Sequence, residues 1–431
     1  MKALLACIGS RGDVQPLLAL AIELTSLGHD AALCVAPNFR DWVESCGISC
    51  LPIGPDLRKL TGGSAPTLAP APAAKPSPEQ LRQLAIQSVQ SQVPVLMQAA
   101  RGCDLIVAAG ALQIGTRSVA EALDVPYVFV AYCPAVLPSS DHPPPKMGFH
   151  HPQGLPAAVN ASLWAAEEAS WNDRFRTVLN EERAKLRLPA IDSVRRHVFT
   201  DRPWLAADAL LGPAAPGTST STGTGTGTGT GMEVVQTGAW FLDDQRPLPP
   251  EVEEFLAAGE PPVYLGFGSM RAAEDTGRVL IEAVRGLGLR SIIAQGWANL
   301  RPADTGSDCL SVGEVTHEAL FPRVAAIVHH GGAGTTAAAA RAGKPQVLVP
   351  HLYDQYYWAH RVGQLGIGVA GPTREALGAA ALSSALRECL RPAVQARALR
   401  FAARVETRGA RNSARLLAES GSGGAQAQSP E

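Results

Sequence analysis

Short apolar runs alternate along the chain with longer stretches whose apolar residues recur at helical spacing. In the first half, the apolar runs lie at residues 2–8, 31–35, 48–53, 104–108 and 127–131, and the helical patterns at residues 16–27, 38–46 and 112–123. A second series of strand-like runs lies at residues 263–266, 291–294, 325–329 and 346–349. Strands that alternate with helices in this way predict doubly wound parallel sheets with helices on both faces.

A low-complexity segment separates the two series. Residues 217–231 read GTSTSTGTGTGTGTG, which offers almost no side chain to bury and cannot form a packed core. We therefore predict two α/β domains with a linker between them. The predicted segments are an N-terminal domain over 1–212, a flexible Gly/Thr linker over 213–236, a C-terminal domain over 237–392, a long helix over 393–418 and a disordered tail over 419–431.

Length and charge narrow the range of functions. The 431 residues fit two domains of ordinary size, and 37 Lys and Arg against 39 Asp and Glu give a formal net charge of −2. This balance gives no general attraction to nucleic acids or acidic membranes. No apolar run reaches the roughly 18 residues of a membrane span. Gly9 ends the apolar N-terminal run after about seven residues, so we expect a buried first strand rather than a signal peptide, and therefore a cytoplasmic protein. We also expect a monomer.

The eight cysteines carry no metal-site pattern. Cys46 and Cys50 are spaced C-x3-C, but no second Cys or His pair with zinc spacing follows them. Cys7, Cys34 and Cys133 lie in or at the ends of apolar runs, where thiols behave as small hydrophobic groups. We expect reduced, structural cysteines.

Two long, Pro-rich segments follow strands of the first domain, at residues 55–78 and 134–156. In open α/β sheets, loops after the carboxyl ends of the strands line the ligand crevice. These segments therefore predict a large substrate surface, and plain surface disorder is the alternative.

The strongest chemical signal is the turn VHHGGAGTT at residues 328–336, followed by an alanine-rich helical stretch. A strand, a glycine turn and a helix start aim several backbone N–H groups and the positive end of the helix dipole at one point. The hydroxyl of Thr335 and the ring of His330 can donate to the same anion. The turn predicts a diphosphate or carboxylate site, and a tight turn packed by small residues is the alternative. Adjacent strand residues point to opposite faces, so His329 and His330 are not expected to share a metal.

A second signal follows the next predicted strand. Asp354 and Gln355 stand where a loop leads into a helix, and together they offer donors and acceptors suited to sugar hydroxyls. Alone, Asp354 would be a helix N-cap.

A third signal is the loop GSRGDVQP after the first strand. Pro16 suits a first helical turn, which would make Asp13 or Gln15 a local capping residue. In the alternative interpretation, Asp13 faces the inter-domain cleft as a general base for a hydroxyl nucleophile.

Several longer segments resemble one family of enzymes. They are GSRGDVQPLLALA, TDRPWLAAD, VQTGAWFLDDQRPL, PPVYLGFGSM, GEVTHEALFPRVAAIVHHGGAGTT and PQVLVPHLYDQYYWAHRVGQLGIGVA. With the Pro-rich loop HPPPKMG, they are similar to the GT-B glycosyltransferases of glycopeptide-antibiotic biosynthesis, the vancomycin and teicoplanin group. The resemblance runs from residue 1 to about residue 417. The turn HHGGAGTT alone is typical of a wider family that includes sterol, macrolide and plant natural-product glycosyltransferases.

This resemblance implies the GT-B fold, in which two Rossmann-like domains face each other across a cleft. It also implies inverting transfer of a hexose or amino-hexose from a dTDP- or UDP-sugar to a hydroxyl of a glycopeptide aglycone. The acceptor is expected on the N-terminal domain and the nucleotide sugar on the C-terminal domain. No D-x-D sequence is present, so we expect no metal requirement.

The resemblance also implies roles for individual residues. Asp13 matches the catalytic base, with Ser10, Arg11 and Gly12 beside it on the acceptor side. The positions that match the donor site are Ser269 near the phosphates, Trp297 and Val315 at the nucleobase, His330, Gly332, Ala333, Gly334 and Thr335 at the diphosphate, and Asp354 and Gln355 at the sugar.

One departure from the family concerns the nucleotide. Relatives often carry a His after GTT, and the plant branch has a Glu nearby for the ribose hydroxyls, whereas residues 337–340 here are all alanine. A deoxythymidine donor is therefore at least as plausible as a uridine donor. The alternatives to a glycopeptide acceptor are a polyketide, macrolide or sterol acceptor, and a catalytically silent GT-B partner protein. The presence of Asp13, His330, Asp354 and Gln355 together favours an active enzyme over a silent partner.

Overall fold

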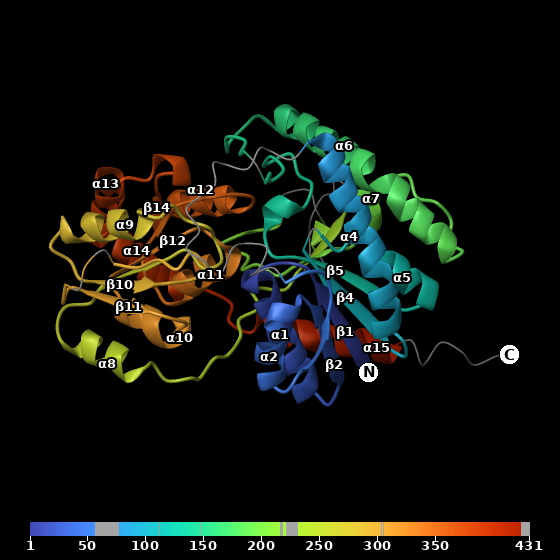
Figure 1. The fold of residues 1–431 in the computed structure, drawn as a ribbon, viewed down its shortest axis with the longest axis horizontal. Coiled ribbons are helices and arrows are strands. Elements are labelled where there is room, and N and C mark those ends of the chain that lie inside the picture. The colour runs from blue at the N-terminus through green and yellow to red at the C-terminus, as the bar shows by residue number, and fades with distance from the viewer. Residues whose placement is uncertain are drawn as a thin grey trace.

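The computed structural model describes residues 1–56, 77–110, 112–147, 149–215, 219–220, 232–302, 304 and 306–423. Two α/β domains lie side by side in it (Figure 1). Each contains one parallel sheet with helices packed on it, as the alternation of apolar runs predicts. Within the described ranges, no helix is long and apolar enough to cross a membrane.

The first domain is built on an eight-stranded sheet with the order β3-β2-β1-β4-β5-β6-β8-β7. Its central strand β1 is buried from its second residue to its last, and a strand covered on both faces needs such a continuous apolar run. In the register of the sheet, Leu4 of β1 lies opposite Ala32 on one side and Ile106 on the other. The strands are β1 (Lys2–Cys7), β2 (Asp30–Val35), β3 (Ser49–Pro52), β4 (Leu105–Ala109), β5 (Tyr127–Ala131), β6 (Trp204–Leu205), β7 (Ser219–Thr220) and β8 (Glu233–Gln236).

Helices and short 3-10 turns connect these strands. In chain order, α1 follows β1, α4 precedes β4 and α5 follows β4. The long helix α6 and the short helix α7 come after β5. The elements are α1 (Arg11–Ser26), η1 (Pro37–Phe39), α2 (Arg40–Ser45), α4 (Pro78–Ala99), α5 (Thr116–Leu123), η2 (Pro134–Val136), α6 (Ala157–Lys185) and α7 (Val194–Phe199).

The second domain has a six-stranded, wholly parallel sheet with the order β11-β10-β9-β12-β13-β14. The strands are β9 (Val263–Gly266), β10 (Ser291–Ala294), β11 (Cys309–Val312), β12 (Ala326–His329), β13 (Gln346–Leu348) and β14 (Gly368–Ala370). The helices and 3-10 turns are α8 (Pro250–Ala257), α9 (Thr276–Arg285), α10 (His317–Leu320), η3 (Phe321–Arg323), α11 (Ala333–Arg341), α12 (Gln355–Leu365), η4 (Arg374–Ala376) and α13 (Ala379–Cys389).

The predicted C-terminal boundary of the linker over 213–236 was wrong. Residues 233–236 form β8, which pairs in parallel with β6 of the first sheet. Val234 and Val235 are buried there, and β-branched residues suit such a strand. The chain therefore crosses to the second domain only after β8. Of the Gly/Thr repeat, only β7 lies within the described residues.

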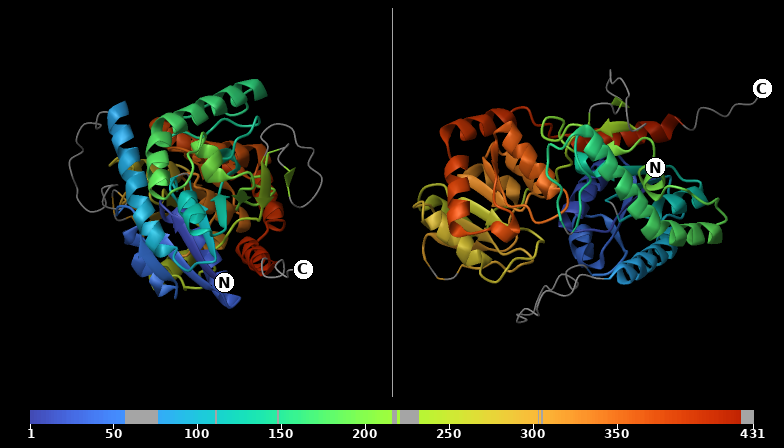
Figure 2. Two further views of the ribbon diagram at one scale, coloured as in Figure 1. Left: turned by 90° about the vertical axis from the view of Figure 1, so that its right-hand side faces the viewer. Right: turned by 90° about the horizontal axis from the view of Figure 1, so that it is seen from above.

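The single helix predicted over 393–418 was also wrong. The chain forms α14 (Pro392–Ala402) and α15 (Gly409–Gly423), separated by residues 403–408. The two helices bury their apolar faces in different cores: Phe401 joins a cluster with Trp358, whereas Ala414 packs with the leucines of α1. One straight helix cannot serve both cores. As a result α15 returns to the first domain (Figure 1 and Figure 2).

The predicted tail over 419–431 begins inside α15, which continues to Gly423. Residues 424–431 lie outside the described part of the chain.

A shared apolar core joins the two domains. Leu205 and Leu211 of the first domain belong to one buried cluster with Leu348 and Trp358 of the second. A Cβ on Gly212 would lie only 2.7 Å from the Trp358 ring, so a glycine is needed for this close approach. The relative position of the domains is therefore fixed by close packing as well as by the covalent crossings.

The crossing before α15 gives a first prediction. A Cβ at Gly409 would lie 2.4 Å from the backbone oxygen of Ala239, which has no flexible end that could yield. We expect Gly409→Ala to lower the free energy of unfolding by about 1–3 kcal/mol, measured by urea unfolding. The control is Gly313→Ala, because a Cβ there meets nothing within 4 Å. Equal stability of the two variants would contradict the close approach.

Candidate active site

Asp13 lies in the first turn of α1, directly after the carboxyl end of β1. Its Oδ2 accepts hydrogen bonds from the Ser10 backbone N–H at 2.7 Å and from Ser10 Oγ at 3.1 Å. Together with the Ser10 side chain this forms a capping box at the helix start. The local capping interpretation is therefore confirmed for Asp13, and it leaves the second carboxylate oxygen free of the cap.

Two glycines make room for this carboxylate. A Cβ on Gly9 would lie 2.3 Å from Asp13 Oδ2, and one on Gly110, after β4, would lie 3.7 Å from Oδ1. Tyr132, which follows β5, donates its hydroxyl to the Asp13 backbone oxygen at 3.0 Å. Burial raises the pKa of the Asp13 carboxyl, against the lowering effect of the Ser10 hydrogen bonds. A carboxylate with a raised pKa is better suited to accept a proton.

The glycine turn of the second domain follows β12. Buried His329 accepts the Gly331 N–H at Nδ1, at 3.1 Å, so its own proton lies on Nε2, which faces Gln346 Oε1 at 2.8 Å. Gly331 has φ of +91°, and Gly332 is the N-cap of α11. Burial lowers the pKa of His329 to about 4. His329 is thus a neutral residue that fixes the turn.

His330 points to the other side, into the turn itself. Two close glycines frame its ring: a Cβ on Gly332 would lie 2.6 Å from Nε2, and one on Gly268 would lie 3.2 Å from Cε1. Its Nδ1 is buried without a hydrogen-bond partner, and burial lowers the pKa of the ring to about 3. A buried polar atom without a partner beside a helix N-terminus fits the predicted anion site.

The remaining residues of the turn form the start of α11. Ala333, Gly334 and Thr335 are its first three residues, and Gly334 is exposed with nothing within 4 Å of an added Cβ. The first N–H groups of a helix have no intrahelical acceptor. An anion can therefore approach the backbone there.

Other predicted donor residues lie at the same edge of the sheet. Ser269 follows β9, Trp297 follows β10 and Val315 follows β11, and all three are half-buried. The Trp297 N–H donates to the Gly268 backbone oxygen at 2.8 Å, which joins the β9 and β10 loops next to His330. The carboxyl ends of parallel strands share one edge, so the structure brings these residues together as the sequence predicts.

Trp297 and Arg11 also bridge the two domains. The Trp297 ring stacks with Phe39 of η1 at 6.3 Å and 24°. Arg11 forms an ion pair with Glu314 of the second domain at 2.5 Å and lies 4.3 Å from the Trp42 ring centre. Arg11, expected on the acceptor side with exposed Gly12, therefore contributes to the domain interface.

Asp354 is the N-cap of α12, and its Oδ2 accepts the Trp358 indole N–H at 3.1 Å. Burial, together with the negative charge of Asp13, raises its pKa to about 7, against the lowering effect of the Trp358 hydrogen bond. The charge of Asp13 thus acts on Asp354 from the other domain, so the two predicted site carboxylates lie near each other.

The side chain of Gln355 is held by contacts within the protein. Its side chain is 3% exposed, and its Oε1 accepts the N–H groups of His351 at 2.8 Å and Leu352 at 3.1 Å. Its Nε2 lies 3.3 Å from Met270 Sδ. The amide oxygen therefore holds the loop before α12, and contact of Gln355 with a sugar stays a prediction.

The structure adds residues that the sequence reasoning missed. Tyr353, with φ of +57°, donates its N–H to the Lys146 backbone oxygen at 3.0 Å, and Tyr356 stacks on His150 at 4.0 Å. These contacts join the predicted acceptor loop over 134–156 to the start of α12. The adjacent aromatic pairs at 150–151 (HH) and 356–357 (YY) mark the two segments in the sequence. Sequence alone cannot show that segments some 200 residues apart contact each other.

Comparisons with known proteins agree with this geometry. Residues 3–138 match the glycosyltransferase family 28 N-terminal domain, and residues 305–410 match the C-terminal domain of the erythromycin biosynthesis protein CIII-like family. Over 424 residues, 97% of each chain, the sequence is 42% identical to a vancomycin aglycone glucosyltransferase of Amycolatopsis orientalis. It is 39% identical to a dTDP-epi-vancosaminyltransferase of the same organism over 92% of each chain.

The chain belongs to the nucleotide-sugar-dependent GT-B glycosyltransferases. Its fold matches that of the glycosyltransferase VinC, solved in complex with dTDP, with a TM-score of 0.66, 20% identity and coverage of 98% of this chain and 100% of that one. A calicheamicin glycosyltransferase matches with the same TM-score at 18% identity, over all of both chains. The predicted fold and enzyme class are confirmed.

No metal cluster accompanies the site in the part of the chain that the structure describes: no group of three or more His, Cys, Asp or Glu side chains there could hold a metal ion.

The pKa of Asp354 gives a second prediction. Between about pH 4 and pH 7, folded glycosyltransferase keeps a proton on Asp354 that the unfolded chain releases, so this group lowers the stability as the pH rises. Asp354→Asn does not titrate. We therefore expect the stability of the variant relative to the parent to increase from pH 5 to pH 8 in urea unfolding.

The control for this prediction is Asp41→Asn, an exposed position in α2. Its stability relative to the parent should change little with pH. A pH-independent difference for Asp354→Asn would show that the carboxyl is not held protonated.

Proposed function

We propose that this glycosyltransferase transfers a hexose or amino-hexose from a dTDP- or UDP-sugar to a hydroxyl of a glycopeptide aglycone, with inversion. The observation that carries this proposal is the 42% identity over 97% of the chain to an enzyme named for the vancomycin aglycone. Asp13, His330 and Asp354 are proposed to supply the groups that the reaction needs.

The acceptor hydroxyl is activated at Asp13. The hydroxyl oxygen attacks the anomeric carbon of the donor sugar while its proton passes to the Asp13 carboxylate, and the bond to the diphosphate breaks on the opposite face. The cap bonds occupy Oδ2, so Oδ1 is the oxygen proposed to take the proton. A phenol with a pKa near 10 is a modest nucleophile, and its position against the sugar should supply much of the rate.

The leaving diphosphate gains negative charge in this step. We propose that it lies against the N-terminus of α11, where the N–H groups, the Thr335 hydroxyl and the His330 ring stabilise that charge. The unpartnered Nδ1 of His330 supports this assignment. Because fixed dipoles and a hydrogen-bond donor meet the charge there, we propose that the transfer needs no divalent cation.

We propose that Asp354 binds the donor sugar and that Trp297 and Val315 contact the nucleobase. Ser269 is proposed to lie near the phosphates. The run of alanines at 337–340 offers no side chain for a ribose 2′-hydroxyl, which favours a dTDP-sugar. We also propose that the N-terminal domain binds the acceptor, with the loop over 134–156 forming part of its surface, and that the monomer is the active unit.

The transfer itself is tested by mass spectrometry. Purified protein is mixed with vancomycin- and teicoplanin-type aglycones and a panel of dTDP- and UDP-hexoses, without added metal. We expect a product heavier by one hexose or amino-hexose. If donor binding is intact and only a macrolide or sterol acceptor is modified, the glycopeptide assignment is wrong; a product that needs added Mg²⁺ would refute the metal-free mechanism.

The role of Asp13 is tested with Asp13→Asn, which keeps an oxygen that can accept the Ser10 hydrogen bonds. We expect turnover to fall by about 10²–10⁴-fold, the usual scale for a lost general base, with the donor Kd unchanged. Asp41→Asn serves as control. Normal turnover of Asp13→Asn would remove Asp13 from the chemistry.

The diphosphate site is tested with His330→Ala. Loss of a hydrogen bond to a charged group should weaken binding of dTDP or UDP by about tenfold or more, measured by calorimetry. His29→Ala is the matched control, because His29 lies at the amino end of β2, whereas the predicted site residues follow the carboxyl ends of strands. An unchanged nucleotide Kd in His330→Ala would exclude the turn as the diphosphate site.

A further inference from the structure

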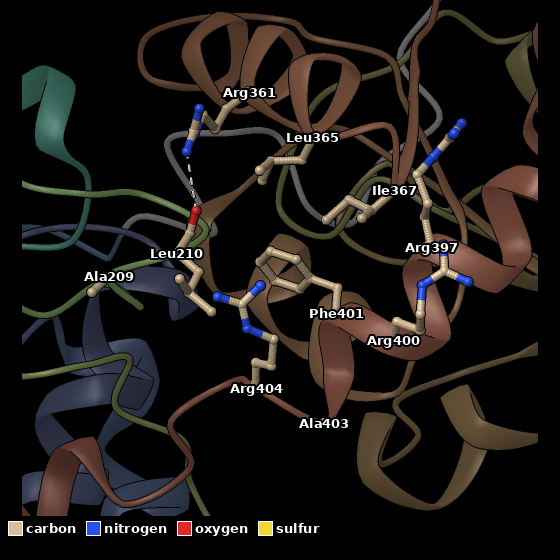
Figure 3. A pocket seen from close by; sticks show the side chains of 10 residues that line it. All are labelled: Ala209, Leu210, Arg361, Leu365, Ile367, Arg397, Arg400, Phe401, Ala403 and Arg404. Atoms are coloured by element: carbon tan, nitrogen blue, oxygen red, sulfur yellow. Dashed lines mark hydrogen bonds between the residues drawn. The ribbon is translucent and has the colours of Figure 1, made fainter.

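A second cavity lies at the far end of α12, away from the reacting groups. Its volume is about 690 Å³, and both domains contribute to its walls (Figure 3). Arg361 stands seven residues after Asp354 on α12, which places it about 10 Å further along the helix axis. The cavity is therefore distinct from the cleft of Asp13 and Asp354.

The cavity is apolar at its base. Leu210 of the first domain faces Leu365 and Ile367, from the end of α12 and beyond, and Phe401 of α14 (Figure 3). A concave, mostly apolar cavity of this size is typical of sites for small organic molecules.

Four arginines surround this apolar base: Arg361, Arg397, Arg400 and Arg404. Hydrogen bonds hold two of them in place. Arg361 donates to the backbone oxygens of Leu210 at 3.1 Å and Leu211 at 3.0 Å, and Arg397 donates to that of Gly366 at 2.9 Å. Backbone oxygens leave the charge of a guanidinium uncompensated.

No carboxylate neutralises these arginines. None of the lining residues is acidic, and among the residues that the structure describes none of the four arginines forms an ion pair. The nearby carboxylate of Asp208 instead accepts the backbone N–H groups of Leu210, Leu211 and Glu406. The cavity is therefore positively charged.

The surrounding sequence strengthens this charge. Residues 391–415 contain seven arginines and one glutamate, with no lysine or aspartate, although the whole chain has a formal net charge of −2. Arg397, Arg400 and Arg404 of this segment line the cavity, whereas Arg391 and Arg408 pair with Glu388 and Glu406. The positive charge of the lining arginines attracts anions.

We propose that this cavity binds a small organic anion, with an apolar body on Leu365 and Phe401 and a phosphate or carboxylate group on Arg404. Arg400 adds positive charge from the other side of Phe401 (Figure 3). Guanidinium groups match both anions through paired N–H donors. The concave shape and apolar base favour such a molecule over an acidic protein, which would need a broad surface. Because Leu210 and α14 belong to different domains, the bound anion also stabilises their relative position.

The probe for this site is 1-naphthyl phosphate, titrated into the full-length protein and followed by its fluorescence and by calorimetry. We expect one site, with binding at least tenfold tighter than that of 1-naphthol or of inorganic phosphate. Saturating dTDP should leave this Kd unchanged. Loss of all binding on addition of dTDP would assign the probe to the diphosphate turn and overturn the proposal.

Variants locate the probe. Arg400→Gln/Arg404→Gln should weaken its binding at least tenfold without changing basal transfer activity. Arg387→Gln/Arg415→Gln removes the same charge from exposed positions outside the cavity and should leave the Kd unchanged. The proposal is overturned if both double variants weaken binding of the probe equally or if neither weakens it. It is also overturned if 1-naphthol binds as tightly as 1-naphthyl phosphate. Tight binding of an acidic protein with no binding of the probe favours a macromolecular partner and also overturns it.

Discussion

The packing of α12 against the first domain determines where the reacting groups lie. The Trp358 side chain is fully buried between Gly212 and the shared apolar core, and its indole N–H holds the Asp354 carboxylate. The same helix start receives the backbone contact from Lys146. Two domains that could have met in many orientations are thereby held with Asp354 in the electrostatic range of Asp13. Close packing of this kind is sensitive to small changes, so the position of the candidate site depends on residues that lie outside it.

Burial acts on the three principal polar groups in the same sense. It raises the pKa of Asp13 and of Asp354 and lowers that of His330, so each group is shifted toward its neutral form. Groups buried in this way interact more strongly with nearby charges, because water screens those interactions less. The α11 N-terminus differs from these groups, because its N–H dipoles are fixed by the fold and do not titrate.

The sequence was sufficient to predict the structure where the local pattern of residues determines it. Buried parallel strands require apolar runs, so β1 and β12 were predicted, and the glycine turn before a predicted helix does lead into α11. It was insufficient where structure depends on distant packing. β8 is only four residues long and becomes a strand because β6 offers an open edge. The break between α14 and α15 follows from two separate cores, and the pairing of Arg11 with Glu314 joins residues some 300 positions apart. The contacts of the Gln355 amide with its own loop could not be predicted either, because they cannot be read from the residue type.

Asp13 shows why a local structural role and a chemical role need not exclude each other. The capping box uses Oδ2, and the two Ser10 hydrogen bonds to that oxygen fix the orientation of the whole carboxylate. Orientation is what a general base requires, because proton transfer depends on the distance and angle to the acceptor hydroxyl. The same hydrogen bonds lower the pKa, and burial offsets them with a net rise. Gly9 makes both effects possible, since any side chain there would displace the carboxylate from the end of β1. The cap therefore fixes the carboxylate with Oδ1 free of the Ser10 hydrogen bonds, which is compatible with the proposed role as general base.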